Sequence, residues 1–331
     1  MKTTNKPFIV SVSPHIRSEE TTARIMWTVS ASLLPATTMG AYFFGPRAVF
    51  TVALCIISSV LAEHLYQKAM KKPTTVHDGS AFLTGLLLGL NLPPTVPFYV
   101  SLIGSFVAIV ITKQLFGGLG YNIFNPALIG RAFLVITFPR LMTLWSEPTA
   151  AFLLLDAKTT ATPLGILKEE GPAKLIEIFG DQMTLYTQLI VGHRAGSIGE
   201  TSAVALLIGG AYLLHKKYIT WHIPLSFLGT ASVIAWIFGV RGALFAGDPL
   251  LHLFSGGMIL GAFFMATDYV TSPSTKNGQI LFGSGCGFLT MLIRLKGGYP
   301  EGVMFAILIM NAFAPLIDRG FQSQIFGAVK K

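Results

Sequence analysis

Apolar stretches of roughly membrane-spanning length alternate with short polar segments along most of the chain. Five of them precede residue 139 and five follow residue 200. At about 1.5 Å per helical residue, about 20 apolar residues cross a hydrocarbon core of about 30 Å. The pattern therefore predicts about ten transmembrane helices, at residues 25–44, 48–66, 79–92, 97–115, 122–138, 201–215, 221–239, 248–269, 278–295 and 301–317.

The composition agrees with this pattern. Of the 331 residues, 52% are hydrophobic and only 12% are charged, and the mean hydropathy is +0.63. Such a chain is too apolar for an ordinary soluble protein of this size, so we expect an all-α protein that crosses a membrane many times. Residues 1–20 contain no apolar run that ends in a small-residue cleavage site, and we predict no removable signal peptide.

The positive charges predict the orientation in the membrane. If the N-terminus is cytoplasmic, fourteen lysines and arginines, Lys113 among them, lie at inner helix ends, and four, Arg294 among them, lie at the outer ends of short loops. Because cytoplasmic loops are enriched in Lys and Arg, we predict cytoplasmic termini in a bacterial inner membrane. This topology accounts for the formal charge of +9 without nucleic-acid binding. The predicted divisions are a cytoplasmic tail at 1–24, a first membrane half at 25–138, a periplasmic loop at 139–200, a second membrane half at 201–317 and a cytoplasmic tail at 318–331.

Two motifs recur in the two membrane halves. Residues 79–85, with the sequence Gly-Ser-Ala-Phe-Leu-Thr-Gly, can be laid over residues 255–261, and residues 131–133 over residues 311–313. Since each half has five predicted helices, the second half begins on the opposite side of the membrane. We therefore predict two inverted five-helix repeats, an arrangement that many transporters share.

One predicted helix in each half is interrupted. The first has about fourteen residues before Pro93-Pro94 and extends about 20 Å, which is short of the hydrocarbon core. The second, from Gly256 to Asp268, is rich in Gly and ends before Ser272-Pro273. Short helices interrupted by Gly or Pro at matching places indicate a site or pathway near the midplane of the membrane. A tilted or re-entrant helix that only packs is the alternative.

Polar and ionisable residues near these interruptions are candidate pathway residues, because such groups are costly inside a membrane. Asn122 and Asn125 either offer oxygens to a cation from an unwound segment or cap the helix that follows. Arg131 lies inside a predicted helix and faces a phosphate, a partner or the bundle interior. Asp78 and Asp268 lie near the ends of the interrupted helices, where they either handle ions or face water.

The remaining ionisable residues near helix ends are interpreted as interfacial anchors. They include Glu63, His222 and His252. None is paired at a metal-ligand spacing, so we predict no metal site. Cys55 and Cys286 lie far apart in apolar runs without a Cys-x-x-Cys motif. This spacing argues against an iron–sulfur cluster or a disulfide framework held by this chain alone.

The long polar segment contains the run Asp156-Ala157-Lys158-Thr159-Thr160-Ala161-Thr162. A threonine hydroxyl is a poor nucleophile, so another enzyme must drive any reaction on it and must read a short sequence. The run resembles the tag read by flavin transferases, which join FMN through its phosphate to the last threonine. That residue is Thr162 here, and Asp156, Thr159 and Ala161 would complete the recognition sequence. The alternative is an ordinary polar turn.

Two further motifs resemble a known family. They are Asp78 to Gly85 and the run Gly-Gly-Leu-Gly-Tyr-Asn-Ile-Phe-Asn-Pro-Ala at 117–127, which is followed by Gly-Arg-Ala-Phe at 130–133. With the threonine tag, they resemble RnfD, a membrane component of the Rnf ion-translocating electron transport complex, over nearly the full chain. NqrB, the related component of the sodium-translocating NADH:quinone reductase, shares these motifs. It is similar only after a longer N-terminal extension, so RnfD is the closer match.

The resemblance implies a membrane electron-transfer subunit of a machine that passes electrons between ferredoxin and NAD and moves Na⁺ or H⁺. It implies FMN bound covalently to Thr162 and suggests a second, non-covalent flavin, riboflavin. The implied partners are the other subunits of the complex, including a second flavin-carrying subunit and iron–sulfur subunits, and a flavin transferase. The usual form of the tag has Gly before the Ala, whereas this chain has Thr160, whose β-branched side chain restricts the backbone.

Two other functions compete with this one. Inverted five-helix repeats with interrupted helices are also similar to the architecture of urea transporters, which favours a small-solute or ion channel without flavin. The third reading is a scaffold whose periplasmic loop docks a partner. Covalent flavin on the isolated chain is expected from the first function and from neither of the others.

Overall fold

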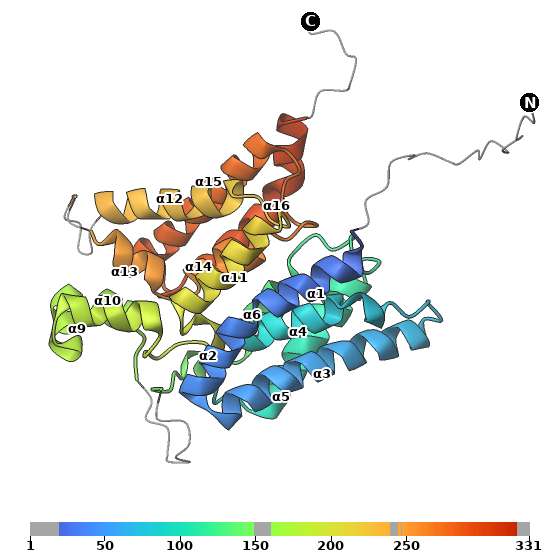
Figure 1. Cartoon of the computed structure of the whole chain (residues 1–331), viewed down its shortest axis with the longest axis horizontal. Helices are drawn as coiled ribbons and strands as arrows, with labels where there is room; N and C mark the ends of the chain where they lie inside the picture. The colour runs from blue at the N-terminus through green and yellow to red at the C-terminus, as the bar shows by residue number, and fades with distance from the viewer. Residues whose placement is uncertain (1–19, 149–159, 239–243, 246, 323–331) are drawn as a thin grey trace, which may run out of the picture.

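The computed structural model describes residues 20–148, 160–238, 244–245 and 247–322. These residues form helices and no β-strands, and an isolated bridge joins Phe238 to Leu244. The predicted all-α class is confirmed. Figure 1 shows two groups of helices, one coloured blue to green and the other yellow to red, with a small yellow-green group at one side of their junction.

The first group contains the helices that precede residue 139. α4 is buried on nearly all sides and packs against α3. It ends at Leu90 because Pro93-Pro94 follows and proline cannot continue a helix. The bounds are Thr22–Ser32 for α1, Leu34–Phe44 for α2, Pro46–Ala69 for α3, Ser80–Leu90 for α4, Phe98–Phe106 for α5 and Pro126–Thr137 for α6, with a 3-10 turn at Val76–Asp78 and a π-helix at Val107–Gln114 that continues α5.

The second group contains the helices that follow residue 200. α12 packs along α15, and α15 packs along α16. The interrupted segment consists of α13, α14 and a short π-helix, with a break at Gly256, whose φ of 65° favours glycine. The bounds are Ala203–His215 for α11, His222–Ile237 for α12, Pro249–Phe254 for α13, Met258–Leu260 for α14, Lys276–Lys296 for α15 and Val303–Gly320 for α16, with the π-helix at Gly261–Met265.

Among the described residues, three helices are long and apolar enough to cross a membrane: α3, α15 and α16. The same residues form five shorter apolar helices, which include α4, α6 and α11. Large hydrophobic side chains such as Phe50, Leu61 and Phe288 point outward from the long helices. In water this exposure would be costly, whereas in lipid it is not. The structure therefore agrees with a membrane protein.

The segment predicted as a long polar loop contains several short helices. Leu164, Leu175, Leu185 and Leu189 form a small separate core, which is completed by Leu251 from the second group. This core fixes the small helical group beside the two larger ones. The bounds are Pro139–Thr143 for α7, Pro163–Glu169 for α8, Pro172–Phe179 for α9 and Gln182–Val191 for α10, with a 3-10 turn at Ile198–Glu200.

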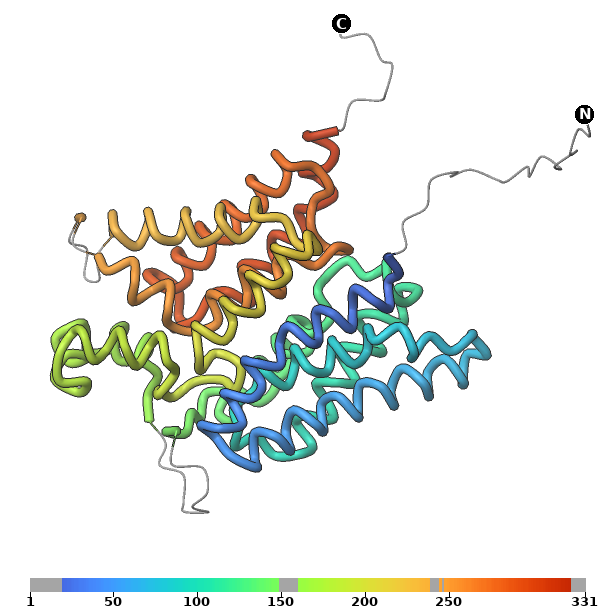
Figure 2. The backbone as a smooth tube through the Cα atoms, in the orientation of Figure 1, coloured from blue at the N-terminus to red at the C-terminus, as the bar shows by residue number. Residues whose placement is uncertain are grey.

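The two large groups meet through α11 and α16. α11 packs against α1 and α2, and α16 packs against α6. Figure 2 shows the yellow α11 running beside the blue helices of the first group. Close approach depends on small residues, as is usual between membrane helices. At Gly209 of α11, an added Cβ would overlap the Ser32 carbonyl oxygen of α1.

We predict that Gly209→Ala loosens this junction. The added methyl group has no space beside the Ser32 carbonyl, and overpacking of this kind costs about 1–3 kcal/mol. The measurement is the free energy of unfolding of the purified protein in mixed detergent micelles. Gly229→Ala on α12 is the matched control, because an added Cβ there meets nothing within 4 Å. Equal stability of the two variants would contradict the close contact.

Candidate functional site

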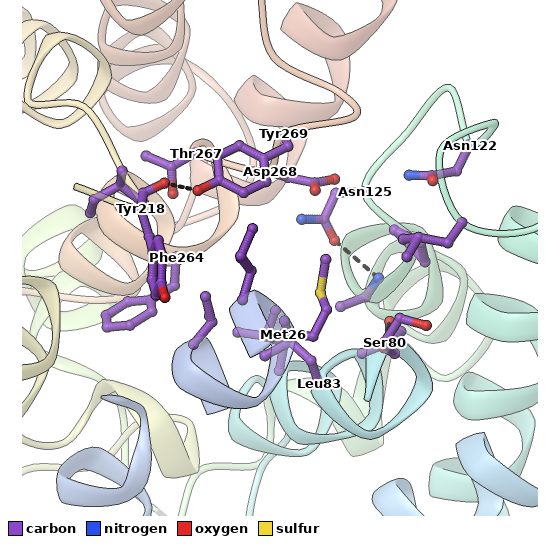
Figure 3. Close-up of a pocket in the computed structure, with 18 of the residues that line it drawn as sticks. Met26, Ser80, Leu83, Asn122, Asn125, Tyr218, Phe264, Thr267, Asp268 and Tyr269 are labelled. Atoms are coloured by element: carbon purple, nitrogen blue, oxygen red, sulfur yellow. Dashed lines mark hydrogen bonds between the residues drawn. The ribbon is translucent and has the colours of Figure 1, made fainter. Parts of the chain in front are cut away.

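A cavity of about 80 Å³ lies between the two helix groups. Its walls come from α1, α4 and the start of α6 on one side, and from α11 and the π-helix Gly261–Met265 on the other. Figure 3 shows its mixed lining, which includes the apolar Met26, Leu83 and Phe264 and the polar Asn125. The cavity therefore lies where the interrupted segments of the two groups meet.

Asn125 connects the start of α6 to the interrupted segment of the second group. Its Oδ1 accepts hydrogen bonds from the backbone N–H groups of Ala127 at 3.1 Å and Leu128 at 3.3 Å, and it thereby caps α6. Its Nδ2 donates to the Met265 carbonyl at 3.2 Å, and its backbone N–H donates to Asn311 Oδ1 at 3.2 Å. Asn125 is therefore both a helix cap and a wall of the cavity.

Asn122 and Asp268 line the same cavity from opposite groups (Figure 3). Asn122 Nδ2 donates to the Phe124 carbonyl at 3.1 Å, while its buried Oδ1 has no hydrogen-bond partner in the described structure. Asp268 Oδ2 accepts from the Thr271 hydroxyl at 3.1 Å. The structure thus brings three of the predicted pathway residues, Asn122, Asn125 and Asp268, to one place.

Asp78 lies at the base of α4, outside this cavity. Its Oδ1 accepts from the backbone N–H of Ser80 at 2.7 Å and from the Ser80 hydroxyl at 2.5 Å. It also lines a second hollow, together with Gln67, Lys72 and His77. Asp78 therefore fixes the start of α4 and borders a solvent-connected hollow.

A buried ion pair lies beside the cavity. Lys113 Nζ is 3.0 Å from Glu63 Oε1 and 2.9 Å from Oε2, and it also donates to the Ser80 hydroxyl at 2.6 Å. The two charged side chains are 2% and 0% exposed. The prediction that Glu63 is an interfacial anchor is therefore wrong, and Lys113, predicted at an inner helix end, is buried as well. A buried charge requires a partner, and these two supply it for each other.

Neighbouring amides complete the coordination of the Glu63 carboxylate. Gln114 Nε2 donates to Glu63 Oε1 at 2.7 Å, and Gln67 Nε2 donates to the same oxygen at 3.2 Å. The Thr75 hydroxyl donates to it at 3.2 Å. Because buried polar groups are costly unless they are hydrogen-bonded, these contacts make the whole network stable in the interior.

Arg131 faces the bundle interior, which was one of its predicted orientations. Its Nη1 donates to Asn91 Oδ1 at 2.7 Å, and its Nη2 donates to Glu301 Oε2 at 2.8 Å. Its Nη1 is also 3.5 Å from Glu200 Oε1. Asn91 is the C-terminal cap of α4. Arg131 therefore ties the end of one interrupted helix to carboxylates that lie near the other.

Two further arginines adjoin this site. Arg194 Nη2 donates to the Glu200 carbonyl at 2.6 Å. Arg294 donates to the carbonyls of His252 at 2.6 Å and Ser255 at 3.0 Å. In the part of the chain that the structure describes, neither arginine has a carboxylate within 4 Å. We call the five buried or partly buried charged side chains the arginine cluster: Arg131, Arg194, Arg294, Glu200 and Glu301.

Sequence reasoning assigned Arg194 and Glu200 to the polar loop 139–200, and it assigned Arg294 and Glu301 to the ends of the predicted helices 278–295 and 301–317. Glu200 and Glu301 follow Gly199 and Pro300 and have no charged neighbours in sequence, which was the signal for burial. An added Cβ on Gly257 would come within 2.8 Å of Glu200 Oε1, so glycine makes room for the carboxylate. The interfacial prediction is also wrong for His222 and His252, which are both buried.

Thr162 is the N-cap of α8. Its hydroxyl accepts a hydrogen bond from the Gly165 N–H at 3.1 Å, and Pro163 occupies the first turn of the helix. Thr162 is half-buried and Ala161 is exposed. Asp156 and Thr159 of the predicted tag lie outside the described residues.

α8 lies against the arginine cluster. An added Cβ on Gly256 would contact Glu301 Oε1 at 2.8 Å, Leu164 Cδ1 at 3.0 Å and Arg294 Nη2 at 3.1 Å, so these three groups surround one point. Lys168 of α8 donates to two carbonyls of the loop between α15 and α16, at 2.5 and 2.8 Å. The helix that begins at Thr162 is thereby held beside buried charges.

Comparison with known proteins gives a consistent result over almost the whole chain. It is 53% identical over 320 residues to the D-type subunit of the proton-translocating ferredoxin:NAD⁺ oxidoreductase complex of Clostridium ljungdahlii, covering 97% of this chain and 96% of the relative. It is 48% identical to the D-type subunit of the Na⁺-translocating complex of Acetobacterium woodii, with coverage of 97% and 96%. It is 40% identical to the D-type subunit of the ion-translocating oxidoreductase complex of Stutzerimonas stutzeri, with coverage of 92% of each chain.

The family comparison covers the two helix groups, the cavity and the segment that holds Thr162. Residues 9–327 match the family described as NQR2, RnfD, RnfE. The relatives named above are D-type subunits of ion-translocating oxidoreductase complexes. This agrees with the resemblance carried by residues 78–85 and 117–133. The chain therefore belongs to the NQR2, RnfD, RnfE family, with RnfD of the Rnf complex as its counterpart.

Proposed function

We propose that this chain is the membrane electron-transfer subunit of a redox-driven ion pump that links ferredoxin and NAD. The observation that carries the proposal is the 53% identity, over 97% of the chain, to a subunit of a ferredoxin:NAD⁺ oxidoreductase complex. The names of two relatives specify different ions, protons in one and sodium in the other. The proposed pump accordingly moves H⁺ or Na⁺.

The proposed redox group is FMN, joined through its phosphate to the Thr162 hydroxyl. The site has features that suit this group. Thr162 is half-buried beside the exposed Ala161, which leaves this side of the residue open to a modifying enzyme. Asp156, Thr159 and Ala161 would form the sequence that the transferase reads. When bound, FMN supplies the ability to accept and release electrons one at a time, while the protein positions it and tunes its potential.

Thr162 would keep the flavin near one position. Its hydroxyl is fixed at the start of α8 by the Gly165 N–H, and α8 is anchored by Leu164 and Lys168. Anchoring at one point prevents loss of the cofactor and limits the distance to an electron-transfer partner. Arg294 and Glu301 lie beside the same helix, so charged groups are available to tune the ring.

The proposed architecture is ten membrane spans in two inverted five-helix repeats, similar to urea transporters. It is supported by the matching positions of α4, which starts at Ser80, and α14, which starts at Met258. The positive charges favour cytoplasmic termini and a periplasmic Thr162 in a bacterial inner membrane. The flavin would then be attached outside the cytoplasm.

The cavity between the two groups is the proposed place for the ion route or for the second flavin, riboflavin. Asn122, Asn125 and Asp268 line it, and Asp78 lies at the neighbouring hollow. Amide and carboxylate oxygens suit Na⁺, and a carboxylate also suits H⁺. Phe263 and Phe264 supply the apolar surface that a flavin ring requires.

The proposed partners are the other subunits of an Rnf-type complex. They include a second flavin-carrying subunit and iron–sulfur subunits, because electrons must reach a periplasmic flavin from ferredoxin or NADH on the cytoplasmic side. A flavin transferase is the proposed maturation partner. The relatives' names, each of which specifies a complex subunit, support this assignment.

The direct test is flavin fluorescence in a denaturing gel. The subunit from cells that contain the transferase is expected to give a fluorescent band at the position of this 35.7 kDa chain, because a phosphoester survives denaturation. Cells without the transferase are the control and should give no band. If the chain is a small-solute channel with the same fold, neither sample should fluoresce. A subunit band without fluorescence would therefore favour that function.

A further inference from the structure

The arginine cluster carries more positive than negative charge. It contains three guanidinium groups and two carboxylates, and Arg131 lies within 3.5 Å of both carboxylates. Arg194 and Arg294 donate to backbone carbonyls instead. Both are nine-tenths or more buried, and Arg194 Nη1 and Arg294 Nε have no hydrogen-bond partner in the described structure. Among the residues that the structure describes, the cluster therefore has one positive charge in excess.

Such an arrangement is expensive without a negative group nearby. Buried ions cost several kcal/mol each even after relaxation, and ionisable groups at membrane depth are retained mainly for function. The contacts within the cluster pair the charge of Arg131 with carboxylates but leave the excess charge in place. The first turn of α8 lies beside Arg294 and Glu301, because Leu164 of this turn adjoins both side chains at Gly256. Thr162 is the N-cap residue of α8.

We propose that the arginine cluster, with Arg294 as the guanidinium next to α8, raises the reduction potential of the flavin on Thr162. This inference rests on the proposed function. One electron enters the flavin ring from a reduced one-electron carrier of a partner subunit, and no protein bond forms or breaks. The positive charge of Arg294 then attracts the negative charge that the ring gains, and it thereby stabilises the reduced flavin. Arg294 acts through this field as a positioning and tuning residue, not as an electron carrier.

The test uses two substitutions that change the charge in opposite directions. Arg294→Gln removes a positive charge, so the midpoint potential of the covalent flavin should become more negative. Glu301→Gln removes a negative charge at nearly constant shape, so the potential should become more positive. A unit charge about 10 Å away, at an effective dielectric constant of about 20, changes such an equilibrium by on the order of tenfold. For a one-electron couple a tenfold change is about 59 mV.

The measurement is a spectroscopic redox titration of the purified complex. Lys296→Gln is the matched control, since Lys296 is exposed at the same end of α15 and water screens its charge. Arg294→Lys keeps the charge, so the midpoint potential of its flavin should remain close to the wild-type value. If Arg294 had only a structural role, the shift in the midpoint potential would not have opposite signs in the Arg294→Gln and Glu301→Gln variants.

The outcomes separate this inference from the proposed function. If the wild-type subunit carries no covalent flavin, the proposed function fails. If the flavin is present and both variants keep the wild-type potential, or both shift in the same direction, the inference is overturned. If the complex with Arg294→Gln does not assemble, the Glu301→Gln variant alone tests the inference. Only a more positive midpoint potential in that variant supports the role of the cluster.

Discussion

The Thr162→Ala variant is expected to carry no covalent flavin, and electron transfer between ferredoxin and NAD in its complex should fall to background. The alanine has no hydroxyl to form the phosphoester, and the redox chemistry belongs to the cofactor. The variant also loses the hydrogen bond from the Gly165 N–H, which costs about 1 kcal/mol at a helix N-cap. The measurements are fluorescence of the denatured subunit and turnover of the intact complex.

Two companion substitutions separate the lost cap from the lost attachment point. Thr162→Asp keeps a good N-cap for α8 but has no hydroxyl, and it should be as inactive as Thr162→Ala. Thr162→Ser keeps both features and should retain flavin. Thr160→Gly restores the usual form of the tag and should not reduce labelling. Full turnover of Thr162→Ala without flavin would show that electrons bypass this residue.

The second large effect is expected at the buried ion pair. Glu63→Gln leaves the Lys113 ammonium in the interior without a countercharge, and breaking a buried pair in this way costs about 3–5 kcal/mol. Lys113→Met leaves the carboxylate unpaired and should cost a similar amount. The double variant should be more stable than either single variant, because no unpaired charge remains and the amide at position 63 still accepts from Gln114.

A double-mutant cycle in the free energy of unfolding, measured in mixed detergent micelles, tests this expectation. The exposed pair of Lys174 and Glu177 is the internal control, and its removal should leave stability unchanged. Additive effects at Glu63 and Lys113 would mean that the two groups do not stabilise each other. The ion pair between the carboxylate and the ammonium group would then contribute nothing to the free energy of unfolding.

The parts of the fold that depend on local signals could be predicted from sequence. Apolar runs fixed the helical class, and Pro93-Pro94 and Gly256 fixed the two interruptions. Asn125 precedes a proline, which is the usual sequence of a helix start, and it does cap α6. The meeting of Asn122, Asn125 and Asp268 at one cavity agrees with the expectation that interrupted helices form a common site.

The charge partners could not be predicted. Glu63 and Lys113 are 50 residues apart, and only the packing of α3 against the π-helix Val107–Gln114 brings them together. A cation count treats every lysine near a helix end alike, so it places Lys113 at an inner helix end without indicating that the side chain is buried. The same limitation applies to Arg294, which the count places at the outer end of a short loop and which is buried at the end of α15.

The helices in the polar segment before residue 200 could not be predicted from its sequence either. It is too polar for a membrane span, so it was interpreted as a loop. Its leucines are spaced over several short helices and close a core only when Leu251 of the second group joins them. Short helices are marginal alone and depend on such packing. This packing places α8, through Leu164, beside the arginine cluster, which no pattern within the segment indicates.

The intact mass of the native subunit tests the central claim most directly. The subunit should be purified from cells that contain the flavin transferase, and its peptides should be mapped after digestion. The expected mass is that of the amino acids plus one FMN phosphoryl group, located on the peptide that contains Thr162. A subunit that weighs only what its sequence requires would contradict flavin attachment at Thr162.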